Sequence, residues 1–243
     1  MNRREFTGSV LAYGLIQMLW ARDLLAEDIK PVVSQWFKNL NDLSQDLKGQ
    51  KFKDTEFQAK MEDLYKKVDL AELVKFIDLD RIAEKAKLPD TGAHSAGFDL
   101  TKVDGIKSLA FGKQIFCLKK GRAVVPHGHE NMCTGFIVLR GTFRGRHYDR
   151  LETHKEHYII KPTIDHEFAA GGASTISDHK DNVHWFACTS ETGYIFNAHV
   201  IGYDPKITEP SGRLYLDPEG EKLSGGLIKA AKMTSAACHK KYG

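Results

Sequence analysis

The most informative part of the sequence is Gly121-Arg-Ala-Val-Val-Pro-His127-Gly-His129-Glu-Asn-Met-Cys-Thr134, which is followed after six further residues by Gly141. Side chains alternate between the two faces of a β-strand, so His127 and His129 point to the same side. Two imidazoles on one inward face are well placed to bind a single metal ion. The stretch therefore predicts a metal-binding strand within a β-structure.

Short apolar segments with a period of two lie on both sides of this stretch, separated by Gly-rich or charged turns. They cover residues 108–111, 114–118, 136–139, 158–160, 183–186 and 194–196. Many short strands at near-regular spacing are typical of a small antiparallel sandwich or barrel. His184 belongs to one of these apolar strands, where an unpaired imidazole is costly to bury. It is the best candidate for a third metal ligand, with His166 and His179 as rivals.

The spacing of Gly121, His127, His129 and Gly141 resembles the first sequence motif of the cupin family. That motif also holds a glutamate ligand, but Thr134 stands at its position here. The resemblance covers about residues 107–204. It implies a mainly β fold, a double-stranded β-helix (cupin) barrel preceded by an α-helical N-terminal region, with one metal ion inside the barrel.

The second cupin motif is represented here only by His184. Its Pro, inner Gly and Asn positions hold His179, Asp181 and Cys188. In lacking this glutamate, the chain resembles one branch of the family, the cysteamine dioxygenases and plant cysteine oxidases. Members of that branch bind iron through three histidines. The resemblance therefore implies Fe²⁺ bound by His127, His129 and His184 and an O₂-dependent oxidation of a thiol to a sulfinate.

A second similarity to this thiol dioxygenase branch lies downstream. The run Gly202-Tyr203-Asp204-Pro205 resembles the turn that ends the barrel in the branch, which places Tyr203 at the position of a tyrosine lining the active site. The chain departs from the branch on the preceding strand, where Asn197, with His199 nearby, replaces an acidic residue. The resemblance implies a small-molecule substrate, a thiol, with O₂ as co-substrate and Tyr203 as a catalytic-site residue.

Three histidines also suit metals other than iron, and zinc, copper, nickel and manganese stay open as alternatives. Two other functions stay open as well. One is a periplasmic cupin that binds a metal or a small ligand without turnover, and the other is a metallocupin that acts on a substrate other than a thiol.

Other polar residues near the motif are expected to have structural roles. Glu130 directly follows His129 and points to the opposite face of a strand. Cys133 and Cys188 are expected in the core. One strand face is shared by Arg140, Arg144 and Arg146, and we expect this face to point toward solvent rather than toward a substrate. The remaining histidines of that region are expected to be solvated: His147, His154 and His157.

Composition excludes several classes of protein. The chain has 243 residues, of which 42% are hydrophobic and 28% charged, as in globular proteins rather than disordered or polytopic membrane proteins. A net charge of +3, from 35 basic and 32 acidic residues, does not indicate nucleic-acid binding. Four cysteines without a CxxC pair indicate neither a disulfide framework nor a cysteine zinc site.

The chain divides into four predicted parts. Residues 1–26 resemble a twin-arginine signal, with Arg3-Arg4 before an uncharged run from Thr7 to Ala21. This predicts a periplasmic or secreted protein; a retained helix and a cytoplasmic location are the alternative. The other parts are a helical region at 27–90, the cupin barrel at 100–206 and a C-terminal extension at 207–243.

Apolar residues with helical spacing support the helical region, since Val33, Trp36, Leu40, Leu43 and Leu47 line one helix face. Gly49 ends this helix, and further helices begin near residue 54 and after the predicted N-caps at residues 69 and 80. We expect this region to pack against the barrel or a sister subunit, which allows a homo-oligomer. The extension is expected to wrap the barrel or fray, with one helix near residues 227–233.

Overall fold

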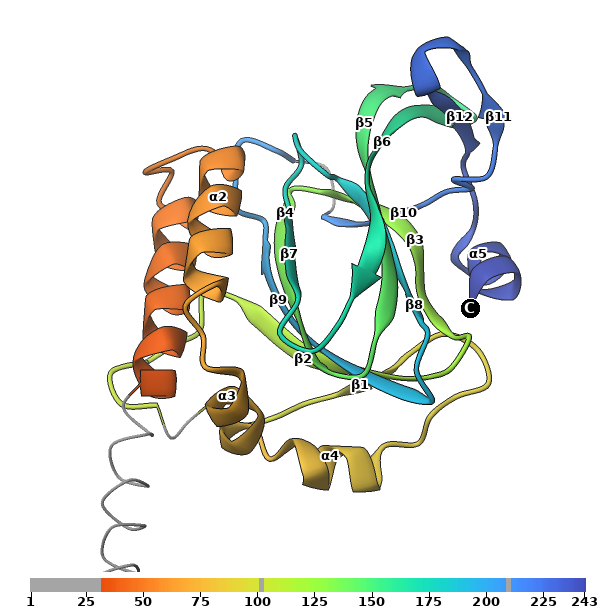
Figure 1. The fold of residues 1–243 in the computed structure, drawn as a ribbon. Coiled ribbons are helices and arrows are strands. Elements are labelled where there is room, and N and C mark those ends of the chain that lie inside the picture. The colour runs from red at the N-terminus through yellow and green to blue at the C-terminus, as the bar shows by residue number, and fades with distance from the viewer. Residues whose placement is uncertain (1–31, 101–102, 209–210) are drawn as a thin grey trace, which may run out of the picture.

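The structure is a computed structural model that describes residues 32–100, 103–208 and 211–243 (Figure 1). The predicted signal segment, residues 1–26, lies outside the described residues. None of the helices within these ranges combines the length and the apolar composition that a membrane span requires.

Two antiparallel β-sheets form the body of the protein. In spatial order, the first sheet contains β1 (His94–Ala96), β2 (Gly112–Lys119), β9 (Thr192–Ile201), β4 (Met132–Arg140) and β7 (Ala173–Ile176). The second contains β10 (Gly212–Tyr215), β3 (Ala123–Glu130), β8 (Val183–Cys188), β5 (Phe143–Thr153), β6 (His157–Phe168), β12 (Ile228–Ala231) and β11 (Glu221–Lys222).

The strands from β2 to β9 pair as a nested series, and this pairing defines the fold. β2 pairs with β9, β3 with β8, β4 with β7 and β5 with β6. One long hairpin is thus wound into two sheets that face each other, which is the double-stranded β-helix. The predicted fold class, a mainly β barrel of this type preceded by helices, is confirmed.

Helices cover the outer face of the first sheet. The first helix is described over residues 32–48, and it lies beside α2 (Asp54–Tyr65) along this face (Figure 1). α2 lies against β4 and β7. The chain continues through α3 (Leu70–Phe76) and α4 (Leu79–Lys85) before it enters β1. The helical region therefore packs on the barrel, as the sequence analysis expected for one of its two alternatives.

The first sheet is buried on both faces because the helices cover one face and the second sheet covers the other. On β9, Ile195 belongs to the core between the sheets, whereas Phe196 belongs to the core under the helices. The Phe196 ring lies 5.9 Å from Trp36 and 6.0 Å from Phe37 of the first helix, measured between ring centroids. Burial on both faces explains why these strands are continuous apolar runs in the sequence.

The C-terminal extension is part of the second sheet. β10 pairs with β3 at one edge, β12 pairs with β6 at the other, and α5 (Ser235–Tyr242) follows. The prediction of a helix near residues 227–233 is wrong, because β12 occupies this segment.

Two further predictions differ from the structure. The segment 108–111, predicted as a strand, is a bend before β2. The helix α4 begins at Leu79, so Asp80 lies inside the helix rather than at its N-cap. Asp69 is confirmed as the N-cap of α3.

We expect Phe37→Ala to lower the free energy of unfolding by about 3–5 kcal/mol, because Phe37 is fully buried at the helix–sheet contact. Urea unfolding followed by circular dichroism measures the change. Val32→Ala, at a side chain that is 57% exposed on the same helix, is the control and should change stability by no more than about 0.5 kcal/mol. A loss below about 1 kcal/mol for Phe37→Ala contradicts the proposed packing.

Candidate metal centre

Three histidines from two neighbouring strands meet between the sheets. His127 and His129 lie on β3, and His184 lies on β8 directly opposite His127 in the ladder. The ring centroids are 4.8 Å apart for His127 and His129, 4.3 Å for His127 and His184, and 5.0 Å for His129 and His184. One nitrogen from each ring lies within 4.8 Å of the others. The structure thus brings together the three residues that the sequence analysis selected.

The orientation of the His127 ring is set by a local hydrogen bond. Its Nδ1 lies 2.7 Å from the carbonyl oxygen of Val125, two residues earlier on β3. Because a carbonyl can only accept, Nδ1 carries the proton of the neutral ring and donates. The lone pair of His127 is therefore on Nε2, where it is available to a metal ion.

The other two rings have no hydrogen-bonding partner among the described residues. Both nitrogens of His129 and both nitrogens of His184 are buried and unpaired. An unpaired buried polar group costs about 1–3 kcal/mol. A neutral imidazole has one nitrogen with a free lone pair, so each of the two rings offers one ligand atom to a divalent ion such as Fe²⁺ or Zn²⁺ beside Nε2 of His127. The three residues therefore fit a metal ion.

Asn182, just before β8, links the two strands that hold the histidines, β3 and β8, through hydrogen bonds. Its Nδ2 donates to the carbonyl oxygens of His129 (3.0 Å) and Ser177 (3.3 Å), and its Oδ1 accepts from the His129 backbone N–H (3.4 Å). Gly128 leaves room for this side chain, because a Cβ there would lie 2.7 Å from Asn182 Oδ1. The glycine between the two histidines is thus required for strand contact.

A small cavity of about 20 Å³ lies against the three rings, enough for about one water-sized species. No Asp or Glu is among the described residues that line it. The lining residues are Gln114, Phe116, Val124, His127, His129, Met132, Thr134, Phe136, His184, Asn197 and Arg213.

Thr134 holds the glutamate position of the motif that this stretch resembles; it lines the cavity and takes part in a polar network. Its Oγ1 donates to the Ala198 carbonyl oxygen at 2.9 Å and accepts from Asn197 Nδ2 at 2.6 Å. Asn197 Oδ1 in turn accepts from Gln114 Nε2 at 3.2 Å. The wall that would hold a carboxylate ligand is therefore neutral.

Burial keeps the three imidazoles neutral. It is the largest cause that lowers the pKa of each ring, to about 3 for His129 and well below the ordinary value for His127 and His184. The positive charge of Arg213 adds to the lowering of all three pKa values. Neutral rings are the form that binds metal.

His147 is a fourth buried histidine, and the prediction that it is solvated is wrong. It is fully buried on β5 opposite His184, with its ring 6.1 Å from that of His184 and 3.2 Å from Ser174 Oγ. The prediction was misled by the many charged residues near His147 in the sequence. Strand alternation could have indicated its burial, since it puts His147 on the face opposite Arg144 and Arg146. The side chains of these two arginines pair with Asp165 outside the barrel.

Tyr203 is not among the residues that line the cavity. It belongs to the core under the helices, and its hydroxyl donates to Asp178 Oδ2 at 3.1 Å. The structure therefore does not bring Tyr203 together with the three histidines. Cys133 is part of the same core, as expected, and Cys188 belongs to the core between the sheets.

The rival ligands lie away from the cavity. His166 is exposed, and His179 is exposed and pairs with Asp54 at 2.9 Å. Glu130 lies 3.8 Å from Arg150 and does not line the cavity. His154 is exposed, as predicted, and His157 is half-buried.

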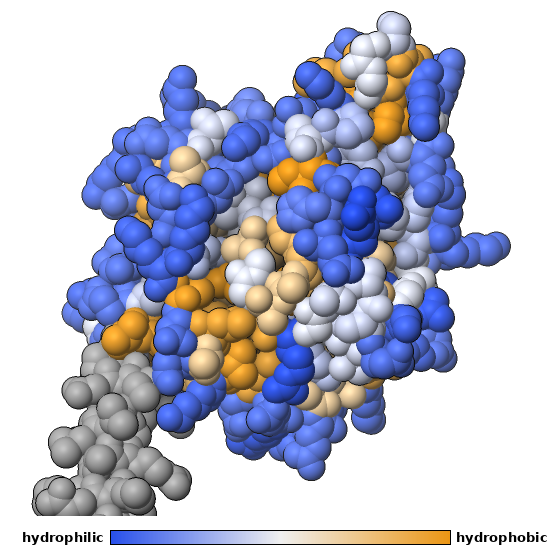
Figure 2. All heavy atoms as spheres, in the orientation of Figure 1, coloured by the Kyte–Doolittle hydropathy of each residue, from blue (hydrophilic) through white to orange (hydrophobic). Residues whose placement is uncertain are grey.

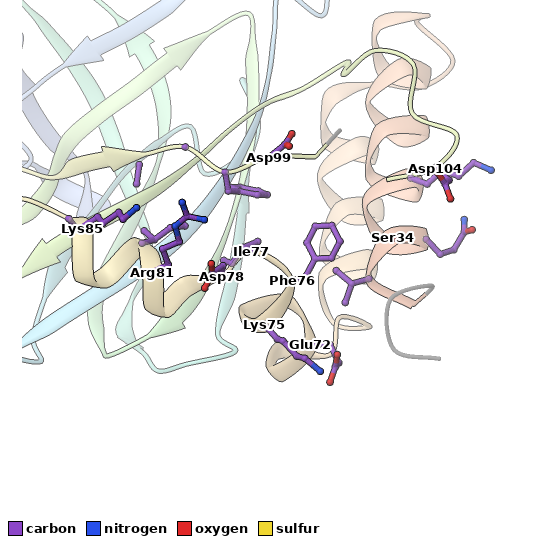
Figure 3. Close-up of a pocket in the computed structure, with 18 of the residues that line it drawn as sticks. Ser34, Glu72, Lys75, Phe76, Ile77, Asp78, Arg81, Lys85, Asp99 and Asp104 are labelled. Atoms are coloured by element: carbon purple, nitrogen blue, oxygen red, sulfur yellow. The ribbon is translucent and has the colours of Figure 1, made fainter. Parts of the chain in front are cut away.

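A much larger hollow lies outside the barrel, between the first helix, α3, α4 and β1 (Figure 3). Its volume is about 1100 Å³, and its wall combines apolar side chains such as Phe76 and Ile77 with charges of both signs, among them Asp78, Arg81 and Lys85. Figure 2 shows apolar side chains gathered on the surface in the lower part of the molecule, near the position of α3 in Figure 1. None of the three clustered histidines lines it, so this hollow and the metal centre are separate.

Comparison with known proteins gives structural matches alone. No protein-family model matches the sequence, and no curated protein matches it. Solved structures that match include an oxalate oxidase in complex with glycolate (16% identity, 50% of this chain and 58% of that chain, TM-score 0.37). A double-stranded β-helix protein from Klebsiella pneumoniae matches with 10% identity over 54% of this chain and 86% of that chain (TM-score 0.36).

The 11S globulin procruciferin from Brassica napus also matches, with 12% identity over 45% of this chain and a TM-score of 0.33. The match spans only 23% of that globulin chain. These similarities are too distant to carry an argument about function. The fold assignment rests on the strand pairing described above.

Gly128→Ala tests the contact between the ligand strands. The added Cβ would displace Asn182, which is held by three hydrogen bonds, so we expect the free energy of unfolding to fall by about 1–3 kcal/mol. Gly97→Ala is the matched control, because a Cβ there meets nothing within 4 Å. Equal stabilities of the two variants in urea unfolding contradict the role given to Asn182.

Burial of neutral histidines also predicts a pH dependence of the metal-free protein. Burial lowers the pKa of His147, like that of His129, to about 3, whereas an unfolded histidine titrates near 6.5. Between these values only the unfolded chain takes up the proton. Stability is therefore lost as pH falls below about 6.5, by about 1.4 kcal/mol per pH unit for each such histidine.

His147→Gln isolates one of these groups without removing a proposed ligand. Urea unfolding of the metal-free protein between pH 7 and pH 5 should give a shallower slope for the variant, by about one proton. An identical slope shows that His147 does not contribute to the pH dependence.

Proposed function

We propose that His127, His129 and His184 bind one divalent metal ion and that the protein is a metal-dependent oxidoreductase. The finer proposal is a thiol dioxygenase that uses iron and O₂ to convert a thiol to a sulfinate. The observation that carries the proposal is the set of buried, unpaired imidazole nitrogens in a cavity without a described carboxylate. The sequence resemblance to the three-histidine thiol dioxygenases supports the finer part.

The charge of the site favours an anionic substrate. Three neutral imidazoles leave the full 2+ charge of an ion, which a carboxylate ligand would have reduced. When bound, iron supplies the redox chemistry with O₂ and a position at which a thiolate can bind. The overall reaction is RSH + O₂ → RSO₂H, in which both oxygen atoms enter the product. Sulfur loses four electrons and O₂ gains four, so no further reductant is required.

The residues of the chain determine the surroundings of the proposed reaction. Phe116, Val124 and Phe136 give the cavity an apolar wall beside the histidines. The Thr134–Asn197–Gln114 network forms a neutral polar wall with fixed hydrogen-bond directions. The Val125 carbonyl oxygen holds the His127 ring in the tautomer that presents Nε2. Tyr203 has no part in this proposal because it lies under the helices.

A second candidate is a cupin that binds a metal or a small ligand without turnover. The observation that favours it is the size of the cavity, about 20 Å³, which leaves little room beside an ion for a substrate. Export by the signal-like residues 1–26 to the periplasm is compatible with both candidates and is proposed for either.

Metal content tests the ligand set. We expect about one divalent ion for each chain of the purified protein by elemental analysis and iron as the active metal. His127→Ala and His184→Ala should each reduce occupancy strongly, since either leaves only two of the three proposed ligands. His154→Ala, which removes an exposed histidine, should keep full occupancy. Full occupancy in the first two variants would mean that the ligands are wrong.

Oxygen uptake tests the reaction. The iron-loaded protein should consume one O₂ for each sulfinate formed from a small thiol, measured with an oxygen electrode and mass spectrometry. Zinc in the purified protein, together with no uptake for any thiol after iron loading, supports the non-catalytic candidate instead. If O₂ uptake requires a substrate other than a thiol, the protein catalyses a different metallocupin reaction.

A further inference from the structure

Met132 lies between the metal centre and the surface. It is the first residue of β4, and strand alternation puts its side chain on the same face as Thr134 and Phe136, which also line the small cavity. Most of the described lining residues are buried, whereas Met132, Gln114 and Arg213 are at least partly exposed. These three side chains therefore separate the cavity from solvent.

Gln114 and Arg213 are held in place by other side chains. Gln114 Oε1 accepts from Ser95 Oγ at 2.7 Å, and its Nε2 donates to Asn197 Oδ1 at 3.2 Å. The guanidinium of Arg213 lies over the Phe116 ring, with its Cζ atom 5.9 Å from the ring centroid. Both side chains therefore have a defined position in the cavity wall.

Met132 is not packed into any hydrophobic core of the described residues. The other apolar residues that line the cavity, Phe116, Val124 and Phe136, belong to the core between the sheets. Within residues 32–100, 103–208 and 211–243, Met132 belongs neither to this core, nor to the core under the helices, nor to the core on the outer face of the second sheet. A thioether side chain is unbranched and flexible, so Met132 can change its rotamer without disturbing the packing of these cores.

The backbone at Met132 is held by several hydrogen bonds. Its N–H donates to Asp178 Oδ1 at 3.3 Å. The preceding residue, Asn131, donates from Nδ2 to the Asp204 carbonyl oxygen and accepts at Oδ1 from the Asp204 N–H, each at 2.9 Å. The Asn131 carbonyl oxygen also accepts from the Gly202 N–H at 2.8 Å. A movement at this position therefore involves the side chain of Met132 rather than the strand.

We propose that Met132 is a specificity-determining residue whose side chain closes the metal centre and sets the size of the ligand that reaches the ion. In the described conformation the cavity of about 20 Å³ holds about one water-sized species. Rotation of the Met132 side chain toward solvent frees the space of its Cγ, Sδ and Cε atoms. The ligands admitted are therefore compact thiols of about that size, and peptide thiols are excluded. This inference rests on the proposed function for the ion and the thiol, but not on the oxidation.

Cobalt tests this inference without turnover, because a thiolate that binds Co²⁺ produces a charge-transfer absorption band. The probes are 2-mercaptoethanol, which is similar in size to the end of a methionine side chain, and the tripeptide thiol glutathione. Each is titrated into the Co²⁺-loaded protein without oxygen, and the absorption band gives the affinity. We expect the unaltered protein to bind 2-mercaptoethanol and to show no binding of glutathione.

Met132→Ala removes the atoms that close the cavity. It should bind 2-mercaptoethanol about 10-fold or more tightly, since a binding-competent minor conformation is typically populated at about 0.1–10%, and it should also bind glutathione. Met132→Leu keeps a similar volume and should continue to exclude glutathione. Met233→Ala, at a partly exposed methionine that does not line the cavity, should match the unaltered protein for both probes. The Co²⁺ content should be the same in all variants, because none removes a proposed ligand.

Three results overturn the role of Met132. The first is equal affinity of the unaltered protein and Met132→Ala for both probes. The second is binding of glutathione by the unaltered protein as tightly as 2-mercaptoethanol. The third is sulfur scattering in the X-ray absorption spectrum of the thiol-free Co²⁺ protein that is lost in Met132→Leu, since Met132 is then a metal ligand.

The failure of this inference and the failure of the proposed function give different results. No Co²⁺ binding by the unaltered protein overturns the metal centre, and the role of Met132 with it. If the size selection is found but the iron-loaded protein consumes no O₂ with any small thiol, Met132 controls access and the oxidation is wrong. If the iron-loaded protein oxidises glutathione and 2-mercaptoethanol equally well, the oxidation holds and the size selection is wrong.

Discussion

The mutual burial of three neutral imidazoles is the constraint around which this structure is arranged. Two of the rings have no partner for either nitrogen, and the third uses one nitrogen on its own strand. Such burial is costly without a ligand, because each unpaired polar group loses its hydration. A divalent ion that coordinates one nitrogen of each ring would offset part of this cost. Under the proposed function, metal binding would therefore also stabilise the barrel.

The nested strand pairing supplies the framework that makes this burial feasible. β3 and β8 are neighbours because the second and the second-to-last strands of the winding pair with each other. The first helix and α2 then cover the outer face of the facing sheet, so that its strands are held from both sides. The C-terminal extension adds β10 next to the ligand strand. Arg213 of this strand is one of the residues that line the cavity.

Strand periodicity predicted a small antiparallel sandwich or barrel, and the resemblance of the histidine motif to the cupin family implied the double-stranded β-helix. The His-Gly-His spacing puts two rings on one face, and an isolated histidine in an apolar strand must face a partner. The positions of His147, Tyr203 and Arg213 depend instead on which strands and loops become neighbours. Charged residues around His147 suggested a solvated hairpin, while Tyr203 follows the barrel but lies under the helices. Arg213 belongs to a segment whose pairing with β3 has no local signal.

X-ray absorption spectroscopy of the metal-loaded protein measures directly whether three imidazoles and no carboxylate of the described chain bind the ion. We expect an extended fine structure with scattering from three imidazole rings, and the loss of one ring's contribution in His184→Ala. Fewer than three imidazoles in the unaltered protein, or a carboxylate of the protein in the first coordination sphere, would contradict it.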